Sequence, residues 1–194
     1  MEHEGRKVVF RALVGSHNYN LNTEESDKDY KHFVLPTFDD LYRNKMFSSS
    51  VIGVDKDIEV HDIRKLPELL WKANVNFLET LFSNETQVNN KYMLEILSMK
   101  DDIATMNLPY LYRACKGMHF NKVKALEKGT EGTQHLVDKY GYDTKQALHA
   151  FRILRVMDDY RCYRFTDFKA AITYGEDMRK TLLSIKNGKY SLEQ

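Results

Sequence analysis

Two stretches decide the fold: residues 7–16, Lys-Val-Val-Phe-Arg-Ala-Leu-Val-Gly-Ser, and residues 26–29, Ser-Asp-Lys-Asp. Residues 7–14 are apolar and rich in β-branched side chains, which is typical of a short buried strand. The strand ends at Gly15-Ser16. Glycine lets a ligand approach the backbone closely, and a turn exposes N–H groups that suit phosphate. Gly15 and Ser16 are therefore candidate phosphate-binding residues.

Two carboxylates follow, at Asp27 and Asp29, where a second strand is expected to begin and to end at Pro36. Side chains two residues apart on a strand point to the same face. Neighbouring carboxylates repel each other unless a cation lies between them, and Mg²⁺ is commonly held by few carboxylates together with substrate phosphates. A third acid would come from a later strand. Glu59 lies between two apolar residues, which favours it, but Asp57 shares its face and remains an alternative.

Outward from these stretches, the pattern predicts an α+β fold. A short helix or turn is expected within 17–25, a helical turn at 38–42, and one strand or two short ones at 51–54 and 58–63. From residue 65 the apolar period changes from 2 to about 3.6. The sequence thus predicts a small mixed sheet in residues 1–64 and a helical region in residues 65–194, with helices near 66–70, 77–82, 90–100, 108–128, 144–160 and 176–186.

Composition excludes several classes of protein. The chain has 194 residues, 42% of them hydrophobic, which is enough for a core and rules out a disordered or collagen-like chain. The net charge of +1 hides an asymmetry, since residues 1–62 carry 8 basic and 12 acidic side chains and residues 63–194 carry 21 and 16. An acidic front suits a metal and a basic back suits a polyanionic substrate, although a chance distribution over solvated faces explains it equally well.

Nothing in the sequence indicates a membrane or an oxidising compartment. No run of 18 apolar residues is present, and the charged N-terminus has no apolar core of a secretory signal. The two cysteines, Cys115 and Cys162, form no CxxC pair, and the scattered histidines do not predict zinc. We expect a cytoplasmic protein without a membrane partner.

The order of strand, Gly-Ser, short helix and Asp-x-Asp resembles the nucleotidyltransferase superfamily of DNA polymerase β. Within it, the chain is similar to the predicted nucleotidyltransferases of bacterial RNA-repair pathways, many of them carried by phages, for which the location would be the host cytoplasm. Residues 57–65, continuing through 72–79, and residues 141–152 support this subgroup. The subgroup often has Gly-Asn-Pro where this chain has Ala-Asn-Val at 73–75. The resemblance covers about residues 8–165.

The resemblance implies a Mg²⁺-dependent transfer of NMP from a nucleoside triphosphate to a hydroxyl group, with release of pyrophosphate. Asp27 and Asp29 would hold two Mg²⁺ ions, which Mn²⁺ can replace, and Glu59 or Asp57 would complete one site and help to deprotonate the acceptor. The implied nucleotide-binding residues are Gly15, Ser16, Ser26, Lys145, His149 and Arg152, and further substrate contacts are expected at Asn18, Tyr19, Lys65 and Tyr142.

Lys145, His149 and Arg152 share one stripe of the expected helix at 144–160, within about 60° of arc. Their spacing predicts that the opposite, apolar face enters the core. The stripe would then be either a clamp for phosphates or an ordinary solvated face, and the resemblance favours the clamp. The expected core-facing residues are Ala147, Ala150, Phe151, Leu154 and Met157.

A second basic segment, residues 109–128, has a net charge of +4 and interleaved aromatic residues. It could form a nucleic-acid surface, with cations on phosphates and rings on bases. It could equally be a basic helix whose aromatics are buried, which is the interpretation that we favour. The residues concerned are Arg113, Lys116, Lys122, Lys124, Lys128 and Glu127, with Tyr110, Tyr112 and Phe120.

Three functions remain in competition. The first is nucleotide addition to an RNA end, in repair or modification. The second is NMP transfer to a protein or a small molecule, of the kind found in toxins or phage defence. The third is a silent module that binds RNA or nucleotide, which the retained pair Asp27 and Asp29 argues against. The sequence leaves open the nucleotide, the acceptor and the oligomeric state.

Overall fold

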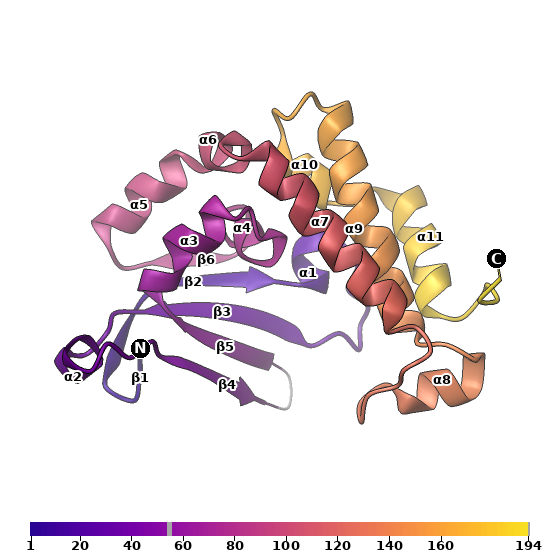
Figure 1. Ribbon diagram of the computed structural model, residues 1–194, viewed down its shortest axis with the longest axis horizontal. Coiled ribbons are helices and arrows are strands. Elements are labelled where there is room, and N and C mark those ends of the chain that lie inside the picture. Colours follow the sequence, from indigo (N-terminus) through magenta and orange to yellow (C-terminus); the bar gives the residue numbers. More distant parts are fainter. Residues whose placement is uncertain (54–55, 194) are drawn as a thin grey trace. The chain divides into compact units, whose positions relative to one another are not determined.

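The computed structural model describes residues 1–53 and 56–193 (Figure 1). The predicted strand residue Val54 lies outside this range. The chain divides into two compact units, residues 1–110 and 111–194, and each is described here by itself. This division separates two parts of the chain that each make most of their contacts internally. The division expected at residue 64 instead marked the place where the sequence pattern changes from strands to helices.

A mixed sheet forms the centre of the first unit. Its strands lie in the order β1-β2-β3-β5-β4, and β6 also pairs with β2. Strands β3 and β5 run parallel and the other pairs run antiparallel. The bounds are β1 Glu2–His3, β2 Arg6–Val14, β3 Lys28–Val34, β4 Ser48–Ile52, β5 Lys56–Asp62 and β6 Thr86–Val88.

The apolar sequence of β2 explains its central place, because Val8, Val9 and Phe10 are all buried. A strand with both faces covered needs such a continuous apolar run. Helices α3 and α4 lie over one face of the sheet (Figure 1), and Leu78 of α4 is fully buried. The helical segments of this unit are α1 Ser16–Tyr19, α2 Phe38–Tyr42, a 3₁₀ turn Ile63–Lys65, α3 Leu66–Trp71, α4 Val75–Leu81, α5 Lys91–Ser98 and α6 Lys100–Thr105.

The α+β class is confirmed, but strand β6 corrects the expectation that everything after residue 64 is helical. Thr86–Val88 pairs with Phe10–Ala12 of β2. Three residues are too short to show an alternating pattern, so only the pairing partner identifies this strand.

The second unit is helical. Its central helix is α9, against which α8, α10 and α11 pack. Ile153, Val156 and Tyr160 of α9 are buried, and the Tyr160 ring meets the Phe168 ring edge-on at 5.2 Å. The helices are α7 Leu108–Lys124, which enters this unit at Leu111, α8 Gln134–Tyr140, α9 Thr144–Cys162, α10 Phe168–Ile172 and α11 Glu176–Lys186.

The face of α9 that enters the core agrees only in part with the expected one, because Ala147 and Ala150 are buried as expected but other residues are not. Phe151 is 54% exposed, whereas Arg152 is only 5% exposed. Leu154, also expected in the core, is exposed as well. Apolar side chains occur almost all round this helix, so periodicity alone does not select its buried side. Within the cationic stripe, Arg152 is therefore buried and His149 is partly buried, whereas Lys145 is exposed to solvent.

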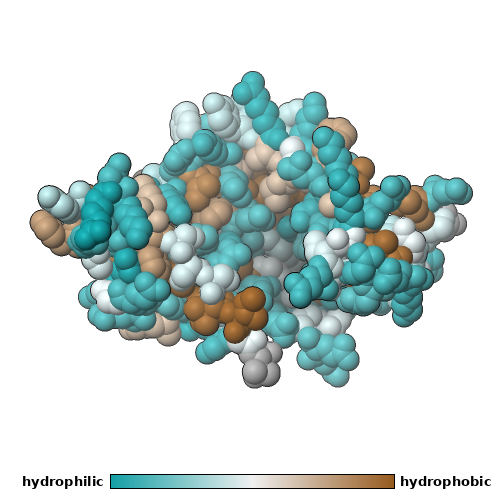
Figure 2. All heavy atoms as spheres, turned by 60° about the horizontal axis from the view of Figure 1, so that its bottom comes forward, coloured by the Kyte–Doolittle hydropathy of each residue, from teal (hydrophilic) through white to brown (hydrophobic). Residues whose placement is uncertain are grey.

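Hydrophilic residues cover most of the surface seen in Figure 2, and apolar side chains form separate patches on it. Within the described part of the chain, no helix is both long enough and apolar enough to span a membrane.

Candidate active site

The turn after β2 brings the first two candidate residues next to an acid. Gly15 has a φ of 71°, in the left-handed region that favours glycine. A Cβ atom on Gly15 would lie 2.5 Å from Oδ2 of Asp29. Only glycine leaves room for this close approach, so the turn and the Asp29 carboxylate form one compact site.

Glu79 of α4 holds this turn in place from the buried side. Its Oε2 accepts a hydrogen bond from the Gly15 N–H at 3.3 Å and one from the Asn18 amide at 3.5 Å. The Asn18 side-chain oxygen accepts from the Asn84 N–H at 3.0 Å. Asn18 and Tyr19 are both buried. Asn18 thus helps to fix the turn, and the substrate contacts expected of Asn18 and Tyr19 stay predictions.

The register of β3 and β5 distinguishes the two candidates for the third acid. Asp57 lies opposite Asp29, whereas Glu59 lies opposite Lys31. Glu59 forms an ion pair with the Lys31 ammonium and accepts a hydrogen bond from His61 at 3.3 Å. The His61 hydrogen bond and the Lys31 charge lower the pKa of Glu59 to about 2. Glu59 is thus paired with the Lys31 cation and hydrogen-bonded to His61, while Asp57 is the neighbour of Asp29.

The residues present fit a hard cation held partly by its substrate. Among residues 1–53 and 56–193, no three His, Cys, Asp or Glu side chains are arranged to share a metal ion. Asp27, just before β3, and Asp29 provide carboxylate oxygens two residues apart. Mg²⁺ is usually bound by one or two carboxylates with substrate phosphates and water, so the chemistry of this pair is compatible with such an ion without a complete protein cage.

Ser26 and Lys65, two other expected site residues, make their contacts elsewhere in the described part of the chain and not with the candidate acids. The Ser26 hydroxyl accepts a hydrogen bond from the Thr23 N–H at 2.9 Å, and the Ser26 carbonyl bonds to the His17 ring at 3.0 Å. Lys65, in the 3₁₀ turn after β5, forms no ion pair with any carboxylate in the described ranges. Ser26 thus stabilises the loop before Asp27.

In the second unit, the cationic stripe of α9 is the centre of a larger cluster. Lys122 of α7 and Lys186 of α11 act on His149 together with Lys145 and Arg152. Burial and these four cations lower the pKa of His149 to about 3, so the imidazole is neutral at pH 7. The sequence did not indicate that Lys122 and Lys186 join the stripe, because they come from helices distant in the chain.

A polar cavity of about 350 Å³ adjoins this cluster. Thr144, Lys145 and Lys186 line it. The Thr144 hydroxyl is buried and has no hydrogen-bond partner within the described ranges. Asp143 caps the helix, because its carboxylate accepts from the N–H groups of Lys145 and Gln146 at 3.0 Å. Two lysines and an unused hydroxyl can bind an oxyanion.

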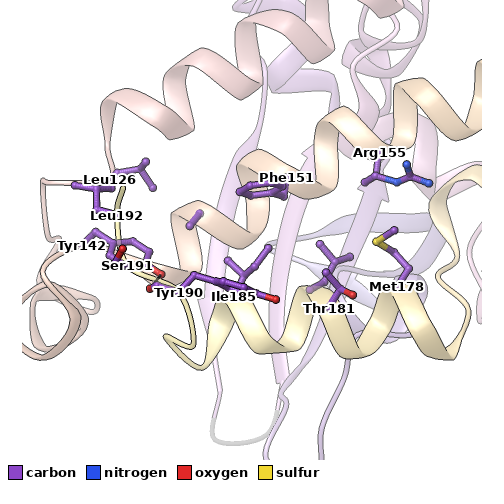
Figure 3. A pocket seen from close by; sticks show the side chains of 12 residues that line it. Leu126, Tyr142, Phe151, Arg155, Met178, Thr181, Ile185, Tyr190, Ser191 and Leu192 are labelled. Atoms are coloured by element: carbon purple, nitrogen blue, oxygen red, sulfur yellow. Dashed lines mark hydrogen bonds between the residues drawn. The ribbon is translucent and has the colours of Figure 1, made fainter. Parts of the chain in front are cut away.

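Tyr142 lies in a different, mostly apolar pocket of about 440 Å³ between α9, α11 and the C-terminal segment (Figure 3). Its buried hydroxyl donates a hydrogen bond to the Tyr190 carbonyl at 2.8 Å. Phe151 of α9 and Ile185 of α11 line the same pocket. Tyr142 thus anchors the C-terminal segment, and the substrate contact expected of it stays a prediction.

Across residues 1–194, the sequence matches the family described as "RNA repair pathway DNA polymerase beta family", RlaP. The chain belongs to the RlaP family. No curated protein matches it. Membership confirms the resemblance seen in the Gly-Ser and Asp-x-Asp motifs and connects the chain with RNA repair and with the nucleotidyltransferase type of DNA polymerase β.

Proposed function

We propose that this RlaP-family protein is a Mg²⁺-dependent nucleotidyltransferase that adds a nucleotide to the hydroxyl of an RNA end. The single observation that carries this proposal is the contact between Gly15 and the Asp29 carboxylate, with Asp57 as the neighbour of Asp29 in the sheet. In this proposal the Gly-Ser turn lies beside the acids, because nucleotidyl transfer requires the triphosphate and the metal-binding carboxylates to be close together.

In the proposed reaction, an acceptor hydroxyl oxygen bonds to the α-phosphorus of a nucleoside triphosphate. The bond from that phosphorus to the oxygen bridging to the β-phosphate breaks, and pyrophosphate leaves. Asp27 and Asp29 would hold Mg²⁺, or Mn²⁺ in its place, which when bound neutralises charge on the entering and leaving oxygens. Asp57 would take up the hydroxyl proton, because Glu59 is already paired with Lys31.

The turn has fewer backbone N–H groups available to a phosphate than the sequence indicated. Glu79 accepts the N–H of Gly15, so the proposed contribution of this turn is space beside Asp29 and the hydroxyl of Ser16. In the second unit, Thr144, Lys145 and Lys186 would bind a phosphate group.

An RNA acceptor is supported by the family and by charge. Residues 111–194 carry 16 Lys and Arg against 10 Asp and Glu, whereas residues 1–110 carry 13 against 18. A basic unit attracts a polyanion. Transfer to a protein or a small molecule is the second candidate, since the pair Asp27 and Asp29 would serve either acceptor equally well.

The deciding experiment measures label transfer from a mixture of α-labelled ribonucleoside triphosphates, with Mg²⁺ and total cellular RNA and protein. Wild type is compared with Asp29→Asn and with Asp101→Asn, which changes an exposed acid on α6 in the same way. We expect label on RNA with wild type and Asp101→Asn, and a loss of several orders of magnitude with Asp29→Asn. Label on protein would favour the second candidate. Full activity of Asp29→Asn would refute the assigned site.

A further inference from the structure

Helix α7 carries an unusual concentration of positive charge. Residues 108–124 contain four Lys or Arg residues and no Asp or Glu. Lys116 and Lys124 are exposed, and no described carboxylate forms an ion pair with either of them. An acid-free helix with exposed lysines is complementary to a polyanion.

The aromatic side chains of α7 are exposed, which corrects the interpretation that they are buried. Tyr112 is 56% exposed and Phe120 is 50% exposed. Lys116 lies midway between them, and steps of four residues keep all three on one stripe of the helix. The two rings start about 12 Å apart along the axis, the length of three to four stacked bases at about 3.4 Å each.

The stripe borders a groove of about 320 Å³ between α7 and α9, here called the α7 groove. The His119 ring bonds to the Ala150 carbonyl of α9 at 3.1 Å and meets the Phe120 ring edge-on at 5.5 Å, so this wall is held in position. At the floor, burial raises the pKa of the Cys115 thiol to about 12, which keeps it neutral and unreactive. The lining residues are Tyr112, Cys115, Lys116, His119, Phe120, Leu154 and Met157.

Exposed rings interleaved with cations along a groove suit single-stranded nucleic acid, because bases stack on rings while the backbone pairs with cations. Paired bases in a duplex are not free to stack on protein rings. An acidic protein segment would engage Lys116 but would give no reason for two exposed rings aligned with it.

We propose that the α7 groove binds the unpaired bases of single-stranded RNA. Tyr112 and Phe120 stack against bases, and Lys116 pairs with the phosphate between them. The inference rests on the proposed function in that this RNA would be the acceptor, but it assigns the binding to residues outside the candidate active site.

The test measures fluorescence anisotropy of a labelled, unstructured 12-nucleotide RNA with the full-length protein. We expect Tyr112→Ala and Phe120→Ala each to weaken binding about tenfold, and Tyr112→Phe to bind like wild type because it keeps the ring. Tyr92→Ala removes an equally exposed ring from α5 in the other unit and should change affinity less than twofold. Lys116→Ala should lower the slope of log affinity against log salt by about 1, and Lys180→Ala should not.

Equal affinity of Tyr112→Ala, Phe120→Ala and Tyr92→Ala for the single-stranded RNA would overturn the proposal. Binding of duplex RNA as tight as that of single-stranded RNA would also overturn it. So would ring-dependent binding of an acidic peptide without binding of RNA. The proposed function is tested separately with Asp29→Asn, which should bind this RNA like wild type while failing to transfer nucleotide. Ring-dependent binding without transfer by wild type would refute the function and leave the groove assignment standing.

Discussion

The contacts of single residues decide which acids can act together. Asp29 packs against the Gly15 backbone and lies beside Asp57 in the parallel register, whereas Glu59 is satisfied by Lys31 and His61. Of two acids on the same face of one strand, the one with a buried cation for a partner is the poorer proton acceptor, because that cation favours its charged form.

Substitution of the two acids should therefore have different effects. We expect Asp57→Asn to lower nucleotide transfer about a hundredfold or more, because the proton acceptor is lost. Glu59→Gln should keep most activity and lower the free energy of unfolding by at most about 1 kcal/mol, since half of the Glu59 side chain is exposed and its ion pair is screened. Steady-state transfer rates and urea unfolding of both variants measure these effects.

Lys31→Met separates the ion-pairing role of Glu59 from the proton-accepting role of Asp57, because it removes the cation that pairs with Glu59. Activity of Glu59→Gln as low as that of Asp57→Asn, with unchanged stability, would assign the proton acceptor to Glu59 instead.

At the scale of elements, α4 positions the turn between β2 and α1. Glu79 is buried, and it receives the N–H of Gly15 and the amide of Asn18. Asn74 begins α4 by accepting a hydrogen bond from the Asn76 N–H at 3.1 Å. The helix is thus fixed at its start and connected to the site by one carboxylate.

Glu79→Ala should loosen the turn while leaving the sheet formed. The partly buried Gly15 N–H and the buried Asn18 amide would lose the carboxylate acceptor, and we expect the free energy of unfolding to fall by about 1–3 kcal/mol. Activity should fall more than the unfolded fraction explains, because Gly15 and Asn18 lose their anchor. Glu79→Gln keeps an acceptor oxygen and should restore part of both quantities, which denaturant titration and transfer assays measure. Equal losses for Glu79→Ala and Glu79→Gln would show that the negative charge, and not the hydrogen bond, is required.

At the scale of the whole molecule, the buried His32 and the partly buried His149 connect stability with pH. Burial, with His3 and Arg11 nearby, lowers the pKa of His32 to about 4, and burial with the surrounding cations lowers that of His149 to about 3. In an unfolded chain a histidine titrates near 6.5. Between these values the unfolded state binds protons that the folded state does not.

The free energy of unfolding should therefore decrease as pH falls below 6.5, by up to about 1.4 kcal/mol per pH unit for each of these histidines, until their folded pKa values are reached. Urea unfolding at pH 7.5, 6.5 and 5.5 measures this slope. His149→Gln should make the slope shallower, whereas His135→Gln, at an exposed position on α8, should leave it unchanged. The same slope in His149→Gln and wild type would show that His149 takes up its proton in the folded protein.

The sequence by itself determined the local elements and the motif. The apolar run of residues 7–14 predicted strand β2, Gly15-Ser16 predicted its end, and Asp29 lies on the expected second strand, β3, which begins one residue after Asp27. The helices expected near 144–160 and 176–186 also formed, as α9 and α11. These features depend on backbone conformation, capping and periodicity, which neighbouring residues along the chain specify.

Only the tertiary structure decided which distant residues meet. The register of β3 with β5 separated Asp57 from Glu59, pairing with β2 made a strand of Thr86–Val88, and packing buried Arg152 while exposing Phe151 and Phe120. A helix with apolar side chains on several sides can bury any of them, and a strand can pair only with what the fold brings beside it. Such choices depend on contacts between segments far apart in sequence, so local pattern could not make them.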